Sequence, residues 1–177
     1  IPNQIDAFKK RTGVIRIVGH RGARGVFPEN TMLGFEYALA SGVPLLEFDV
    51  VLPADDLPVI THNPTLHKPT FQDQTGQFIS KELPIRSLSF ADLGRYEVGK
   101  IDGTTAYGAA FPDQAQVAGL RVPALAELCA LVKQPRHHAA HLLLELKSDP
   151  RLIDMRAHFV AQVLRMPAND VRKLQVA

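Results

Sequence analysis

The segment "GHRGARGVFPENT", residues 19–31, places a histidine and two arginines among three glycines, directly after the apolar run Val14–Val18. Its glycines match neither the dinucleotide pattern G-x-G-x-x-G nor a phosphate loop ending in Gly-Lys-Ser/Thr. His20 carries an imidazole that titrates near neutral pH, and Arg21 carries a planar guanidinium that suits phosphate oxygens. A salt bridge from Arg21 to a carboxylate is the structural alternative. The segment therefore predicts acid-base chemistry and anion binding at the end of a strand.

Two further motifs hold chargeable side chains two residues apart. "LLEFDVVL" contains Glu47 and Asp49, and "LLLELKSD" contains Glu145 and Lys147. In a strand, residues at this spacing face the same side, and a buried carboxylate without a partner costs several kcal/mol. Internal salt bridges, for example Glu145 with Lys147, are one solution. Three carboxylates with a single lysine favour a bound hard cation, Mg²⁺ or Ca²⁺, held by oxygen ligands.

A second histidine, His62, directly follows the apolar run Leu57–Thr61 and so matches the position of His20 after its own strand. A lone histidine at a strand end is usually a structural hydrogen-bonding group. Two at equivalent strand ends beside an acidic cluster predict a general acid and a general base. The remaining histidines lack this context and are interpreted as surface or structural residues: His67, His137, His138, His141 and His158.

The elements that must position these groups are short strands alternating with helices. Apolar runs predict buried strands at Val14–Val18, Leu45–Val51, Leu57–Thr61 and His141–Leu146, and the tail Lys173–Ala177 begins another. Helical patterns follow the cap Asn30-Thr31 up to Ser41-Gly42, and recur at Ser89–Tyr96, Pro123–Val132 and Ile153–Met166. Glu29 and Asn30 either cap the first helix or reach the site. This alternation predicts parallel pairing in a sheet that is buried on both faces.

The composition predicts one globular domain over residues 1–177, with 46% hydrophobic and 21% charged residues. The polar stretch 68–122 is predicted to be an insertion, either a functional loop or a small subdomain. A net charge of +2 from scattered residues argues against nucleic-acid binding. No apolar run reaches the roughly 20 residues of a membrane span. The single cysteine, Cys129, excludes an internal disulfide and lies in an apolar helical stretch, which predicts a packed thiol.

In this order, "GHRGARGVFPENT", "EFDVVLPADDLPVITHNPTL" and "ELK" resemble the glycerophosphodiester phosphodiesterases, metal-dependent hydrolases on a TIM-barrel scaffold. The stretch "YEVGK…FPDQ…GLRVPALAEL", residues 96–128, is similar above all to bacterial exported members. Because a (β/α)₈ barrel needs about 250 residues, the resemblance implies its N-terminal half, with the insertion after the third strand. The missing half or a second copy of the chain is expected to cover the open sheet edges. A periplasmic or secreted location is implied, although no signal peptide is present and a cytoplasmic one stays open.

The resemblance also implies the reaction: hydrolysis of a small-molecule glycerophosphodiester to glycerol 3-phosphate and an alcohol. His20 and His62 correspond to the catalytic pair, and we expect His62 to be the acid. The residues expected to contact substrate or phosphate are Arg21, Lys147 and Asn30. The expected ligands of one Mg²⁺ or Ca²⁺ are Glu47, Asp49 and Glu145.

Three positions depart from the family's usual pattern. Asn63 stands where an Asp usually follows the histidine, Lys68 lies where an Arg is usual, and Pro53 replaces a Thr. Asn63 removes a negative charge beside His62. Two other functions therefore remain as alternatives: a phospholipase D-like phosphodiesterase acting on lipid head groups, and a non-catalytic binding barrel.

Overall fold

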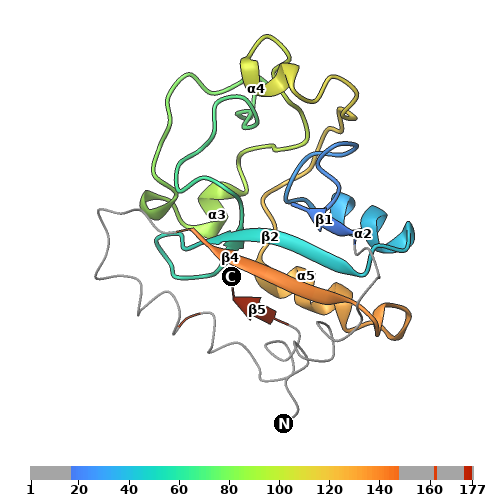
Figure 1. Ribbon diagram of the computed structural model, residues 1–177. Helices are drawn as coiled ribbons and strands as arrows, with labels where there is room; N and C mark the ends of the chain where they lie inside the picture. Colours follow the sequence, from blue (N-terminus) through green and yellow to red (C-terminus); the bar gives the residue numbers. More distant parts are fainter. Residues whose placement is uncertain (1–16, 148–161, 163–173, 177) are drawn as a thin grey trace.

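The structure, a computed structural model, describes residues 17–147, 162 and 174–176 and is built on a parallel sheet (Figure 1). Each parallel strand pairs with its neighbour in the order β1-β2-β4-β5. A fifth strand, β3, pairs antiparallel with β2. The strands are β1 (Val18–His20), β2 (Leu45–Val51), β3 (Val59–Ile60), β4 (His141–Leu146) and β5 (Leu174–Val176).

The predicted strands at 45–51 and 141–146 are confirmed, and β5 lies within the apolar tail. In the first predicted strand, residues 14–16 lie outside the described residues, and His20 is the last residue of β1 rather than the residue after it. The prediction of a parallel strand at Leu57–Thr61 is wrong. A parallel crossover needs about a dozen residues or more, and segment 52–58 is too short, so the chain turns back as β3.

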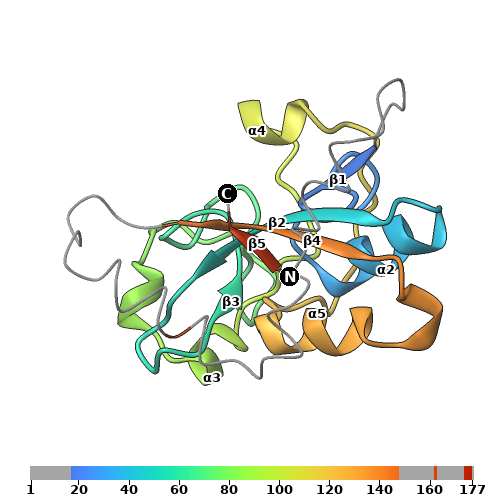
Figure 2. The same ribbon diagram turned by 60° about the horizontal axis from the view of Figure 1, so that its bottom comes forward.

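Two helices, α2 (Met32–Ala40) and α5 (Leu125–Val132), lie side by side against one face of the sheet (Figure 2). Thr31 caps α2, as predicted, by accepting a hydrogen bond from the Gly34 amide at 3.2 Å. Alternate residues of β2 and β4 face these helices and form the core. Its fully buried side chains include Phe35, Leu46, Phe48, Val50, Leu125, Leu128, Leu142 and Leu144. The intervening residues of β2 and β4 therefore face the opposite side of the sheet.

The thiol of Cys129 belongs to this core and is 1% exposed, which confirms its predicted packing. Burial raises the pKa of the thiol to about 11. The predicted helix at Ser89–Tyr96 is shorter, because α3 spans Phe90–Leu93. The predicted helix at Ile153–Met166 lies outside the described residues, except for residue 162.

Residues 61–124, which we call the cap, contain the predicted insertion 68–122 and form a packed body above the sheet (Figure 1). The cap contains α3 and two further short helices, η1 (Ile85–Ser87) and α4 (Ala106–Ala109). A fourth short element, η2 (Pro135–His137), follows α5. A second apolar cluster fills the cap and includes Val51 of β2 and Val59 of β3. Its members from the cap are Leu66, Phe71, Ile85, Leu93, Val98 and Val122. The cap is therefore a folded layer rather than an open loop.

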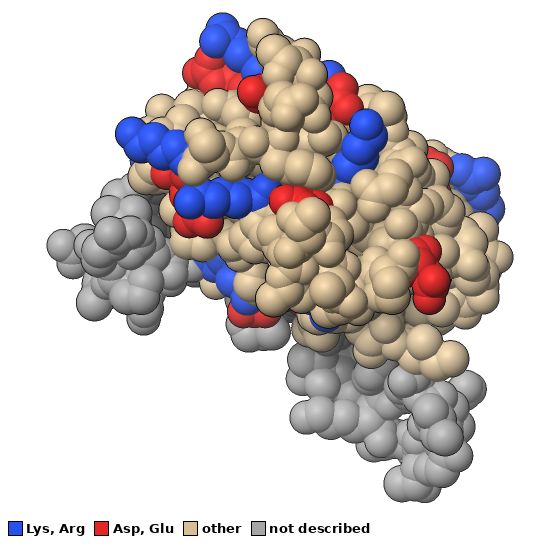
Figure 3. All heavy atoms as spheres, turned by 90° about the horizontal axis from the view of Figure 1, so that it is seen from above, with Lys and Arg blue, Asp and Glu red and all other residues tan. Residues whose placement is uncertain are grey.

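The charged surface shows no large patch of one sign on the face seen in Figure 3. Lysine and arginine side chains stand there in small groups beside aspartate and glutamate. None of the described helices is long and apolar enough to cross a membrane.

The cap's stability can be tested at Gly99. A Cβ atom added there would lie 1.6 Å from the Val117 carbonyl oxygen, whereas one added at Gly103 would meet nothing within 4 Å. We expect Gly99→Ala to lower the free energy of unfolding by about 3 kcal/mol, because the cap backbone must move apart. Urea titration of both variants measures this, with Gly103→Ala as the matched control. Equal stability of the two variants would contradict the described packing.

Candidate active site

The register of the sheet brings three carboxylates together on the face opposite the helices. Asp49 is the Cα partner of Glu145, and Glu47 is the partner of His20. One oxygen from each of the three carboxylates lies within 4.8 Å of the others. The side chain of Asp49 is 1% exposed, that of Glu47 12% and that of Glu145 45%. The cluster therefore runs from a buried end to an open end, and its members share one face of the sheet, as the period-2 spacing predicted.

Asp49 is the buried centre of this cluster. Its Oδ2 accepts a hydrogen bond from Asn30 Nδ2 at 3.0 Å and lies 3.3 Å from Arg21 Nε. Its Oδ1 lies 3.3 Å from Lys147 Nζ, and the same ammonium contacts the Glu145 carboxylate. The salt bridges considered as the structural alternative are therefore present. Together with the hydrogen bond of Asn30, they place the three predicted phosphate contacts around the single carboxylate of Asp49: Arg21, Asn30 and Lys147.

A tight turn between β1 and α2 aims Arg21 at the cluster. Arg21, Gly22 and Asn30 have positive φ angles of 52°, 81° and 55°. Such a conformation at a non-glycine residue costs about 1–3 kcal/mol, so the surroundings must hold it. The Arg21 amide donates to Glu47 Oε2 at 3.0 Å, and the Asn30 amide donates to the Arg21 carbonyl at 2.9 Å. Arg21 thus contacts two of the carboxylates, Glu47 by its amide and Asp49 by its guanidinium.

The two predicted catalytic histidines are placed differently. His20 Nε2 lies 3.6 Å from Glu47 Oε2, with the side chain 52% exposed. Partial burial, followed by the charges of Arg24 and Arg21, lowers the pKa of His20, so its neutral form is favoured. His62 is half-buried, and its Nδ1 lies 2.5 Å from the Asn63 Oδ1, which can only accept a hydrogen bond.

The position of His62 depends on the unexpected direction of β3. The Thr61 amide donates to the Asp49 carbonyl at 3.0 Å, so the chain returns toward the cluster just before His62. No side-chain contact joins His62 to the carboxylates among the described residues. The side chain of His20 therefore contacts the cluster directly. His62 is linked to the cluster by the backbone hydrogen bond of its neighbour Thr61.

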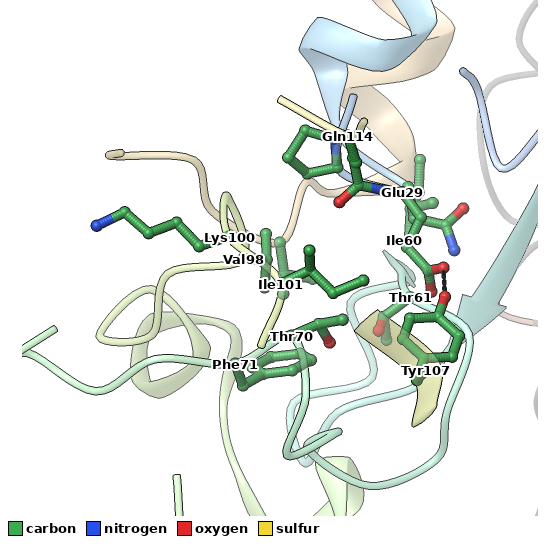
Figure 4. Close-up of a pocket in the computed structure, with 13 residues that line it drawn as sticks. Glu29, Ile60, Thr61, Thr70, Phe71, Val98, Lys100, Ile101, Tyr107 and Gln114 are labelled. Atoms are coloured by element: carbon green, nitrogen blue, oxygen red, sulfur yellow. Dashed lines mark hydrogen bonds between the residues drawn. The ribbon is translucent and has the colours of Figure 1, made fainter. Parts of the chain in front are cut away.

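The cap contributes residues that the sequence patterns did not single out. Tyr107 of α4 donates a hydrogen bond to the Glu29 carboxylate (Figure 4). Glu29 in turn accepts from Arg21 Nη1 at 3.2 Å. Burial, together with the nearby charge of Glu29, raises the pKa of the Tyr107 hydroxyl. The His67 ring packs edge-on to Tyr107 with centroids 4.9 Å apart. The sequence context indicates a surface or structural role for His67, and its contact with Tyr107 places it at the edge of the site.

A small pocket lies between the cap and the β1–α2 turn (Figure 4). Glu29 and Tyr107 stand at one end of it, joined by their hydrogen bond, and apolar side chains of the cap form the other wall. Its lining includes Glu29, Asn30, Thr61, Thr70, Phe71, Ile101 and Tyr107. Glu29 and Asn30 therefore reach the site, while Thr31 caps the helix.

A divalent cation fits the cluster. Asp49 Oδ1 and Asn30 Oδ1 are buried without a hydrogen-bond partner, although Lys147 lies within ion-pair distance of Asp49. Burial, with the negative charges of Asp49 and Glu145, raises the pKa of Glu47, because the charged form of this carboxyl is disfavoured there. A donor set made only of carboxylate oxygens suits Mg²⁺ or Ca²⁺.

A parallel β/α sheet whose inner face carries acidic residues toward the C-terminal strand ends is the arrangement of a TIM-barrel active site. Residues 20–174 match the glycerophosphoryl diester phosphodiesterase family, so the chain belongs to this family. The fold is that of a TIM barrel, of which the described sheet forms part. This confirms the fold class and the family expected from the motifs.

Known relatives agree with this assignment. A solved structure from Silicibacter pomeroyi, described as a glycerophosphoryl diester phosphodiesterase, is 43% identical, with a TM-score of 0.86, and the match covers 94% of this chain and 58% of that one. Glycerophosphodiester phosphodiesterase domain-containing protein 5 of Homo sapiens is 30% identical over 149 residues, 81% of this chain and 24% of that protein. A Bacillus subtilis relative is 30% identical over 148 residues, 84% of this chain and 51% of that protein. The chain thus spans about a quarter to a half of these two relatives.

The central position of Asp49 leads to a stability prediction. Asp49→Asn removes the charge that compensates Arg21 and Lys147, and breaking a buried pair in this way costs about 3 kcal/mol. Glu145→Gln, at a half-exposed position, should cost under about 1 kcal/mol. Denaturant unfolding in the presence of a chelator separates this effect from metal binding. An Asp49→Asn protein as stable as the Glu145→Gln protein would show that Asp49 does not organise the site.

Proposed function

We propose that the protein hydrolyses glycerophosphodiesters to glycerol 3-phosphate and an alcohol with the help of one Mg²⁺ or Ca²⁺ ion. The observation that carries this proposal is the convergence of Arg21, Lys147 and His20 on the carboxylates of β2 and β4. A phosphodiester needs cationic groups around its oxygens, and its hydrolysis needs proton transfer at both ends of the cleaved bond. Family membership supports the proposal. So does the structure of an Oleispira antarctica phosphodiesterase in complex with its product, sn-glycerol-3-phosphate.

In this proposal Glu47, Asp49 and Glu145 hold the cation, which neutralises charge that develops on the phosphate oxygens. Arg21 and Lys147 bind the non-bridging oxygens of the diester. Both already lie against Asp49, so their positive groups are fixed at the site before substrate arrives. Asn30 keeps Asp49 in place through its hydrogen bond and contributes to the same wall.

His20 and His62 divide the proton transfers between them. The lowered pKa of His20 favours the neutral imidazole, which suits the general base that activates the attacking oxygen. His62 then protonates the leaving alcohol. Its partner Asn63 is neutral, so it orients the ring without adding the negative charge that an aspartate would supply.

The arrangement of the described residues favours neither of the alternative functions. A lipid head-group phosphodiesterase needs an apolar rim around its site. The pocket is lined by none of the large exposed hydrophobic residues of the described part of the chain: Ile17, Val18, Val26, Tyr37 and Leu57. A periplasmic or secreted location completes the proposal, supported by the likeness of residues 96–128 to exported bacterial members.

The metal assignment is tested with Glu47→Gln. We expect the affinity for Mg²⁺ or Ca²⁺ to fall about tenfold or more and hydrolysis to be lost, because a neutral amide replaces a charged ligand. In the unaltered protein, affinity should rise with pH through the raised pKa of Glu47, since its protonated form cannot bind metal. Titration calorimetry at several pH values measures both effects. Unchanged metal affinity in a folded Glu47→Gln protein would refute the ligand set.

The proton-transfer roles are tested with His20→Ala and His62→Ala. Each should lower turnover of a glycerophosphodiester by about 10²- to 10⁴-fold. A diester with a nitrophenolate leaving group needs no general acid, so the His62→Ala protein should recover much of its rate and the His20→Ala protein should not. The exposed His138, which ends η2, provides the control His138→Ala, which should keep full activity. Equal losses with both substrates would rule out separate acid and base roles.

A further inference from the structure

Arg24 occupies the junction between the cap and the β1–α2 turn. Its guanidinium carbon lies 4.8 Å from the centroid of the Phe111 ring, and its carbonyl accepts a hydrogen bond from Gln114 Nε2 at 2.7 Å. The Phe111 ring lies 5.4 Å from that of Tyr107, which in turn donates to Glu29. Arg24 is therefore held at the edge of the same group of contacts that positions Arg21.

Among the described residues Arg24 forms no ion pair. Its side chain interacts with the Tyr107 hydroxyl, and Glu29, the carboxylate of this turn, is engaged by Arg21 and Tyr107. Arg24 nevertheless lies next to the site, because the Phe111 ring on which it stacks contacts Tyr107, and Tyr107 donates to Glu29 beside Arg21. A half-buried guanidinium that is fixed by stacking and lacks an anion is suited to bind one from solution.

The same arrangement leaves little for a cationic ligand to bind. Quaternary ammonium groups are recognised by open aromatic faces or by free carboxylates. Here the Phe111 face is covered by Arg24, the Tyr107 ring packs against His67 and Phe111, and Glu29 is engaged. A positive head group placed at this wall would meet Arg24 instead.

We propose that Arg24 is a specificity-determining residue that selects diesters whose alcohol part carries an anionic group, a carboxylate or a further phosphate, over those with a quaternary ammonium. The proposal rests on the phosphodiesterase function proposed above. The alcohol part lies against the wall formed by Arg24 and Phe111, while Arg21 and Lys147 bind the diester phosphate itself. Because a guanidinium can donate two parallel hydrogen bonds, it binds a carboxylate or phosphate at a defined orientation.

The test uses three diesters of glycerol phosphate that differ only in the alcohol: 3-hydroxypropanoate, propanol and choline. In the unaltered protein we expect kcat/KM to fall in this order, with the anionic diester about tenfold above the choline diester. Arg24→Gln should reduce this ratio to about one, by lowering the first value and raising the last. Arg24→Lys should keep most of the ratio, because it keeps the charge.

Arg95→Gln is the matched control, since Arg95 is an exposed arginine of the cap that pairs with Asp92. It should leave the ratio unchanged. A ratio that Arg24→Gln leaves unchanged, or an unaltered protein that prefers the choline diester, would overturn the proposal. Binding of the three diesters, measured by calorimetry with a chelator present, ranks them without turnover. Loss of hydrolysis with the ranking retained would refute the proposed activity and leave the role of Arg24 standing, whereas a lost ranking would refute that role.

Discussion

The site depends on one buried carboxylate, that of Asp49, and on the groups that make its burial possible. A charged group that is 1% exposed is costly unless it is paired. Asp49 meets this requirement with a guanidinium and an amide from the two ends of the β1–α2 turn and an ammonium that follows β4. Each of these segments is thereby fixed: the β1–α2 turn by Arg21, the start of α2 by Asn30 and the end of β4 by Lys147. A polar group inside the sheet thus organises the elements around it.

The cap is joined to this centre by a short series of polar contacts. Tyr107 donates to Glu29, Glu29 accepts from Arg21, and Arg21 lies against Asp49. Each contact adds a constraint on the orientation of the next side chain, so the guanidinium of Arg21 cannot turn without disturbing α4. Long side chains lose considerable entropy when they are ordered. Here that loss is incurred during folding rather than when a ligand binds, which is the physical meaning of a preorganised site.

Much of this arrangement could be predicted from local patterns. β2, β4, α2 and the shared face of Glu47, Asp49 and Glu145 follow from apolar runs, a capping threonine and period-2 spacing, all of which are readable over a few residues. The antiparallel direction of β3 was missed because an apolar run predicts a strand but not whether it pairs parallel or antiparallel. Only the short length of segment 52–58 indicated antiparallel pairing. Tyr107 and His67 could not be found, since their roles come from contacts far apart in the sequence. Arg24 stood within the first motif, yet nothing there indicated that an aromatic ring would hold it.

The two faces of the sheet specify different aspects of the register between β2 and β4. A slip of one residue would turn the apolar side chains away from α2 and α5, so the core forbids it. A slip of two residues keeps the alternation intact, and the core alone discriminates weakly against it. On the other face such a slip would set Asp49 opposite Leu143 or Lys147 instead of Glu145. The charged residues of the site therefore help to specify the register of β2 and β4. A cluster that is costly to bury thus also disfavours misaligned pairing of these two strands.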